Sequence, residues 1–161
     1  PIGVVMSADL FGYVTVLTDD LGIGQQLERA LPYFDYVMPM VYPSHYNKGF
    51  AGLKNPNSDP YAVVYQSMVE SVRRTLATST PVRTLSGMLV ASSSPARYTK
   101  NVYPANKMRP WLQDFDYGKD YTPTDIAAQI KATEDAGLNS WIFWDAGNKY
   151  SSLRQHLAPK P

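Results

Sequence analysis

Three aspartates in this chain follow short apolar runs, and this placement is typical of carboxylate chemistry. Asp9 follows Val-Val-Met-Ser-Ala, Asp114 follows Trp-Leu-Gln, and Asp145 follows Ile-Phe-Trp. If the runs are strands of one parallel sheet, the three carboxylates converge at one edge of that sheet. There they could serve as general acid, general base or charge stabiliser, and glycoside hydrolysis needs such a pair. The alternative is that each aspartate caps the turn or helix that follows it.

Aromatic and hydrogen-bonding side chains accompany these aspartates. Trp111 and Trp144 could stack on the faces of sugar rings, although most Trp side chains pack in cores. His45 could bind a hydroxyl group, although a lone loop histidine is more often a surface residue. The predicted catalytic residues are Asp9 and Asp114. The predicted substrate-binding residues are Tyr42, His45, Tyr46, Trp111, Gln113, Trp144 and Asp145.

Strand alternation divides these candidates between two faces. Within one strand, Trp111 and Gln113 point to one side and Asp114 points to the other. Because both sides cannot face one cleft, either Gln113 or Asp114 needs a local bend in the chain. The same argument separates Trp144 from Asp145.

Four strands that alternate with four helices are expected to position these residues. The apolar runs predict strands over residues 3–9, 35–42, 108–114 and 140–145. Spacing and end signals predict helices over 25–31 and 60–78, a third between Thr122 and Gly137, and a last one over 151–157. The buried stripe predicted for the longest helix is Tyr61, Val64, Met68, Val72 and Leu76. This order predicts an α/β fold in which right-handed crossovers join parallel strands.

Residues 79–107 break this pattern. The segment is rich in Ser, Thr and Pro around one apolar stretch, residues 88–90. We interpret it either as an inserted loop with a small hairpin or as a lid over a cleft.

Composition argues against several classes of function. The 161 residues carry a formal net charge of +1 with acids and bases interspersed, so no nucleic-acid partner is expected. The lack of cysteine excludes disulfides and thiol catalysis, and no second histidine stands at metal-ligand spacing from His45, so we expect no metal. Gly22-Ile23-Gly24 lacks the rest of a dinucleotide fingerprint, and we expect no cofactor. The apolar runs are too short for a membrane span, and no signal peptide is visible.

The chain also resembles a known family along most of its length. The similarity lies in five segments, Ser-Ala-Asp-Leu-Phe-Gly (7–12), Asp-Asp-Leu-Gly-Ile-Gly-Gln (19–25), Met-Pro-Met-Val-Tyr-Pro-Ser-His-Tyr (38–46), Arg-Pro-Trp-Leu-Gln-Asp-Phe (109–115) and Trp-Asp-Ala-Gly-Asn (144–148). They occur in this order in a bacterial glycosyl-hydrolase barrel family of poorly known function, which is distantly similar to the α-amylase-like barrels. The resemblance covers nearly the whole chain except the 79–107 segment.

This resemblance implies that the chain is the C-terminal half of a TIM-type (β/α)8 barrel, with strands five to eight in four βα units. Residues 1–161 would then form a single partial-barrel domain. By position, Asp9 matches the acid/base of the α-amylase-like group, where Glu is usual, and Asp114 matches its stabilising carboxylate. The strand that carries the nucleophile in that group is absent from this sequence. Half a barrel leaves two open edges and an apolar inner face, so we expect the missing N-terminal half or a second copy to cover it.

The leading hypothesis is therefore a segment of a glycoside hydrolase-like barrel that acts on a bacterial or plant polysaccharide. The alternative is a non-catalytic glycan-binding or cell-envelope module on the same scaffold, since fold does not determine function. The chain starts at Pro1 without an initiator methionine, which favours a piece of a longer protein, and an inert fragment is a third possibility. We expect a carbohydrate partner and an extracellular or cell-envelope location in a bacterium.

Overall fold

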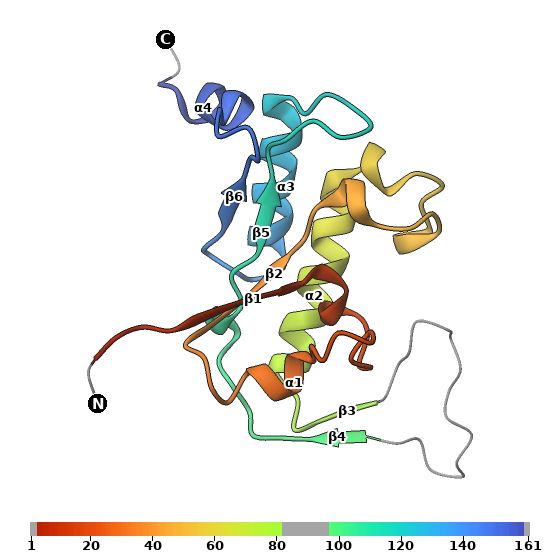
Figure 1. Ribbon diagram of the computed structural model, residues 1–161, viewed down its shortest axis with the longest axis vertical. Coiled ribbons are helices and arrows are strands. Elements are labelled where there is room, and N and C mark those ends of the chain that lie inside the picture. The colour runs from red at the N-terminus through yellow and green to blue at the C-terminus, as the bar shows by residue number, and fades with distance from the viewer. Residues whose placement is uncertain (1–2, 82–96, 160–161) are drawn as a thin grey trace.

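A parallel four-stranded sheet forms the centre of the protein (Figure 1). The computed structural model describes residues 3–81 and 97–159. The sheet order is β1-β2-β5-β6, and its strands are β1 (Ser7–Phe11), β2 (Tyr36–Met40), β5 (Trp111–Gln113) and β6 (Ile142–Trp144). Each neighbouring pair in this sheet is parallel, which confirms the predicted α/β fold with a parallel sheet.

Helices alternate with these strands. They are α1 (Leu27–Ala30), α2 (Pro60–Leu76), α3 (Pro123–Asp135) and α4 (Ser151–Leu157). Short 3-10 turns lie at Gly12–Thr15, Pro43–His45, Phe50–Gly52, Pro56–Ser58 and Ala105–Lys107. Figure 1 shows α2 and α3 behind the strands, where they pack on each other. Among the described residues, none of the helices combines the length and the apolar character that crossing a bilayer requires.

The two longest helices begin at their predicted caps. The Asp59 carboxylate accepts the N–H of Ala62 at 3.0 Å, and Pro60 occupies the first helical position of α2. Thr122 and Asp125 form a reciprocal capping box at the start of α3. These caps satisfy N–H groups that a helix start otherwise leaves without partners.

One face of the sheet is buried against α2 and α3. Its strand residues belong to a single core cluster with helix residues such as Val63, Met68 and Ile126. The sheet residues on this covered face are Leu10, Val37, Val41, Leu112 and Phe143, each no more than 8% exposed. This burial supplies the apolar contacts that hold the sheet to its helices.

The opposite face, which we term the open face, carries larger side chains that stay accessible. Phe11, Met40, Trp111 and Ile142 stand side by side across the four strands, because each is paired in register with the next. Phe11 remains 38% exposed and Trp144, on the same side of β6, remains 43% exposed. The open face therefore presents an apolar row to the surface.

The first strand begins later than the sequence predicts. Residues 3–9 are predicted to be a buried strand, but β1 starts at Ser7, and Val4, Val5 and Met6 are 51–69% exposed. An edge strand has a partner on one side only, so an apolar run there is not buried by the sheet itself. As a result Asp9 is the third of five strand residues and does not end the strand.

The junction between β2 and β5 is short. Met40 pairs with Trp111, and an isolated parallel bridge joins Val37 to Met108. Two residues after Trp111, the side chain of Gln129 from α3 accepts the N–H of Gln113 at 2.9 Å and donates to its C=O at 2.8 Å. The buried amide thereby replaces a neighbouring strand for the backbone groups of Gln113.

The buried side of α2 differs from the predicted one in its last turn, where it contains an ion pair. Arg74 is 0% exposed and donates to both carboxylate oxygens of Glu28, at 2.8 and 2.6 Å. It also donates to the carbonyls of Val14 and Leu17, which fixes the loop after β1 against the helix. Leu76, predicted to be inside, is 48% exposed, because the last turn of α2 directs Arg74 inward instead.

The 79–107 segment contains an antiparallel strand pair. β3 (Ser79–Pro81) pairs with β4 (Arg97–Thr99), as a small hairpin would require. After β4, Lys100 Nζ donates to carbonyls at the C-terminal end of α2. The middle of the predicted loop or lid, residues 82–96, lies outside the described residues.

Candidate functional site

One hydrogen bond on the open face joins two predicted site residues. The indole Nε1 of Trp111 donates to Oδ1 of Asp9 at 2.8 Å, across the intervening strand β2. Asp9 is exposed and Trp111 is half-buried, so the pair lies at the surface. The ring of Trp144 meets that of Trp111 edge-on, with centroids 6.0 Å apart. The result is a carboxylate held beside two indole rings, an arrangement that can contact both the hydroxyl groups and the C–H face of a sugar.

Tyr42 adds a hydroxyl group next to this pair. Burial raises the pKa of Tyr42, and the nearby Asp9 carboxylate and Tyr150 hydroxyl raise it further. The phenol therefore stays protonated at neutral pH and can donate a hydrogen bond.

His45 belongs to an aromatic cluster. Its ring centroid lies 5.6–5.8 Å from the rings of Tyr42, Phe115 and Tyr117. Partial burial lowers the pKa of His45, which favours the neutral imidazole. Nδ1 lies 2.9 Å from Ser44 Oγ, and that hydroxyl donates to Gln113. We therefore assign the proton to Nδ1, which leaves Nε2 as an acceptor.

Gln113 connects the loop after β2 to β5. It is 0% exposed, and its Oε1 accepts the N–H of Ser44 at 3.2 Å and the Ser44 hydroxyl at 2.9 Å. Its Nε2 donates to the C=O of Phe115 at 2.9 Å. With its amide occupied in this way, Gln113 holds the His45 loop in place.

Tyr46 lies in the core at 8% exposure. Its hydroxyl accepts that of Ser67 at 3.2 Å, and its ring packs 4.4 Å from that of Phe50 and 4.7 Å from that of Tyr13. A side chain at Gly12 would meet the Tyr46 hydroxyl at 2.6 Å, so the close approach requires glycine. These contacts give Tyr46 a structural role.

Asp114 and Asp145 lie together in a pocket of about 150 Å³ at the C-terminal ends of β5 and β6. Asp114 is 7% exposed; its Oδ2 accepts the N–H of Leu153 at 3.3 Å, and its Oδ1 has no hydrogen-bond partner among the described residues. Burial raises the pKa of Asp114, and the charges of Asp145 and Asp116 raise it further, against the opposing effect of the backbone N–H groups of Leu153 and Ser152. Asp114 is thus biased toward the protonated acid.

The Asp145 carboxylate folds the turn that follows β6. It accepts the N–H groups of Gly147, Lys149 and Tyr150, each at 2.8 Å. Burial opposes ionisation, but these donors outweigh it and lower the pKa of Asp145. Asn148 and Tyr150 hold φ values of 52° and 50°, a region that disfavours non-glycine residues. This arrangement matches the capping alternative for Asp145.

The predicted site residues therefore separate into distinct clusters. Asp9, Tyr42, Trp111 and Trp144 meet at the open face, Asp114 and Asp145 share the pocket, His45 joins the aromatic cluster, and Gln113 and Tyr46 are buried. Strand alternation places Asp9 on the open face, whereas Asp114 follows the end of β5 and lines the pocket with Asp145. The two predicted catalytic residues thus belong to different clusters.

Among the aromatic residues at these clusters, the sequence-based set lacks Phe115, Tyr117 and Tyr150. The aromatic residues that flank Asp116, directly after a strand, were an available signal for the first two. Tyr150 had none, because its position depends on the strained turn held by Asp145. Within residues 3–81 and 97–159, no three carboxylate or imidazole side chains are grouped so that they could hold a metal ion.

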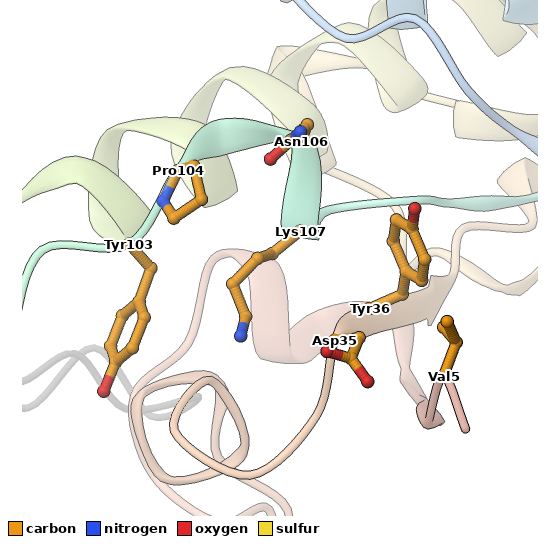
Figure 2. A pocket seen from close by; sticks show the side chains of 7 residues that line it. All are labelled: Val5, Asp35, Tyr36, Tyr103, Pro104, Asn106 and Lys107. Carbon is orange, nitrogen blue, oxygen red and sulfur yellow. The ribbon is translucent and has the colours of Figure 1, made fainter. Parts of the chain in front are cut away.

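A separate hollow of about 350 Å³ lies at the start of β2 (Figure 2). Figure 2 shows the ammonium end of Lys107 between Tyr103 and Asp35, and the Lys107 Nζ lies 5.2 Å from the Tyr103 ring centroid. This hollow contains none of the predicted site residues. It faces the amino ends of the strands, whereas ligands of parallel α/β folds bind at the carboxyl ends.

Comparison of the sequence with known families indicates a carbohydrate-related class of protein. A family model described as a putative glycosyl hydrolase domain matches residues 1–150. The chain belongs to this family, which confirms the glycosyl-hydrolase part of the resemblance and indicates a glycan-related function. No curated protein and no solved structure matches the chain.

Proposed function

We propose that the open face binds a polysaccharide chain within a glycoside hydrolase of the TIM-barrel class. The observation that carries this proposal is the hydrogen bond from Trp111 to Asp9, at 2.8 Å on an accessible surface. It orients one carboxylate oxygen and leaves the other toward a ligand. Trp144 and Tyr42 extend the same surface by a stacking face and a hydroxyl donor. The substrate is a bacterial or plant polysaccharide.

Asp9 is the carboxylate that we assign to acid/base chemistry. Hydrolysis of a glycosidic bond uses two carboxylates that flank it. Asp114 belongs to the separate pocket, so the second carboxylate in this proposal comes from a strand outside this sequence. In this proposal the chain supplies strands five to eight of the barrel.

The half-barrel arrangement also calls for a cover over the open face. β1 and β6 are the edge strands of the sheet, and the row from Phe11 to Ile142 is apolar. Exposed edges and apolar faces favour association. We therefore expect the complementary half-barrel or a second copy to cover this face. Light scattering tests this, since a monomer at high concentration would contradict self-association of the isolated chain.

The proposal is tested with Asp9→Asn and Trp111→Phe, in this chain and in the longest polypeptide that contains it. A screen of bacterial and plant polysaccharides supplies the substrate. Asp9→Asn should lower turnover by at least about 100-fold and spare binding, because an amide cannot exchange the proton. Trp111→Phe should weaken binding by about tenfold through loss of the indole contact. Asp120→Asn and Trp141→Phe are the matched controls, and unchanged turnover in Asp9→Asn removes Asp9 from the mechanism.

A second candidate function is glycan binding without hydrolysis, in an extracellular or cell-envelope module. It is favoured by the state of the other two aspartates, since Asp145 and Asp114 both accept backbone N–H groups of their own chain. Binding that Trp111→Phe weakens, with no turnover in any polypeptide containing the chain, would favour this candidate.

A further inference from the structure

The pocket around Asp114 has the features of a ligand site of its own. We infer that it binds the protonated amine of an amino sugar, so that the glycan recognised by this protein carries free amino groups. This inference rests on the proposed function for the identity of the glycan, but its binding test needs only a monosaccharide.

The first support is an oxygen without a partner. Asp114 is 7% exposed, and its Oδ1 atom is buried. This oxygen accepts no hydrogen bond from the described residues. By contrast, Asp145 accepts three backbone N–H groups, and Asp116 accepts the N–H of Tyr121 at 2.7 Å. A buried polar atom normally has a partner, so Oδ1 of Asp114 marks where a donor from a ligand fits.

The second support is the charge of the pocket lining. Asp114, Asp116 and Asp145 face a single lysine, Lys149. An ammonium group brings both a positive charge and three N–H donors, and charge-assisted hydrogen bonds are stronger than neutral ones. The described residues contain no grouping suited to a metal ion, so an organic cation is the ligand class that this lining fits.

The third support is size and location. The volume is about 150 Å³, which is enough for the amine-bearing edge of a sugar ring. Phe115 lines this pocket, and its ring lies 5.3 Å from that of Tyr42, which follows the end of β2. The amine of one sugar unit can therefore enter the pocket while neighbouring units lie toward the open face.

Binding of an amine in this pocket should depend on pH. Burial raises the pKa of Asp114, and the groups that face it are Asp116, Asp145, Lys149 and the phenol of Tyr121. A cation prefers the ionised carboxylate, so binding should strengthen as the pH rises through the raised pKa of Asp114. It should weaken again where the amine of the ligand loses its proton.

The test is an NMR titration of this chain with glucosamine, and with N-acetylglucosamine as the uncharged control. Glucosamine should shift the Asp114 carboxyl signal and the Leu153 amide, and should bind at least about tenfold more tightly than the acetylated sugar. Asp114→Asn should remove this preference, whereas Asp120→Asn should keep it. Equal binding of the two sugars, or an unchanged preference in Asp114→Asn, overturns the inference.

Lys149→Ala provides a test that does not depend on a buried substitution. Lys149 is exposed, and its loss removes the cation that competes for the three carboxylates, so glucosamine binding should become tighter. Weaker binding in this variant contradicts the inference. The proposed function fails separately: it is wrong if no polysaccharide depends on Asp9 and Trp111, whereas the amine inference is wrong if the Asp114 pocket does not discriminate the two sugars.

Discussion

The two faces of the sheet show how the same strands serve stability on one side and chemistry on the other. On the covered face, Leu112 and its neighbours are at most 8% exposed and pack on α2 and α3. On the open face, at positions adjacent to those residues in each strand, Trp111 and Trp144 keep accessible rings, and Asp9 is exposed. Because side chains alternate, the residues of the covered face stabilise the fold, whereas the open face keeps several large side chains accessible.

The largest effect is expected from a substitution in the core on the covered face. Leu112→Ala should lower the free energy of unfolding by about 2–5 kcal/mol, because it leaves a cavity in the core. Ile142→Ala, on the open face of the adjacent strand, is the matched control and should cost less, since Ile142 is only partly buried. Urea unfolding measures both values. Equal losses in the two variants would contradict the division between the faces.

A smaller effect is expected at the carboxylates beyond the sheet. Asp145→Ala removes the acceptor of three backbone N–H groups, and should lower the free energy of unfolding by about 2–3 kcal/mol. Asp116→Ala removes the acceptor of one such group and should cost about 1 kcal/mol. Thermal and urea unfolding compare the two variants. A cost at Asp145 no greater than at Asp116 would show that the turn folds without its carboxylate.

Much of the fold follows from local sequence signals. The caps Asp59 and Thr122, the stop at Gly137 and the last helix at Ser151–Leu157 all lie where local rules predict them. Such signals act within a few residues, so the sequence displays them directly.

What the sequence does not display is what depends on distant partners. Arg74 is buried because Glu28, 46 positions away, and two loop carbonyls receive its N–H groups. The spacing of apolar residues predicts Leu76 on the buried side of the helix, because such spacing contains no information about an ion pair with a distant residue. The pair Asp9 and Trp111, separated by 102 positions, was predicted residue by residue but not as a contact.

Prediction of the candidate site from the sequence was limited for the same reason, because it depends on distant partners. Placement after a strand predicted equivalent roles for Asp9, Asp114 and Asp145, but their surroundings are not equivalent. A neighbouring indole, a buried pocket and a tight turn surround them respectively. The surroundings of Asp9 and Asp114 come from β5 and α4, which no spacing along one segment encodes, whereas those of Asp145 come from the turn that follows it.

The smallest expected effect concerns the two aspartates of the pocket. The contributions of Asp114 and Asp145 to the free energy of unfolding should change with pH in opposite directions. The folded pKa of Asp145 lies below its unfolded value of about 4, so Asp145 stabilises the fold above that pH and loses this contribution as the pH falls through the folded pKa. The folded pKa of Asp114 lies above the unfolded value, so its contribution is lost as the pH rises. The unfolding free energies of Asp145→Asn and Asp114→Asn, each measured against the parent chain from pH 3 to 7, should therefore diverge. The deficit of Asp145→Asn should grow with pH, while Asp114→Asn should gain relative to the parent. Parallel curves would mean that burial does not separate the two carboxylates.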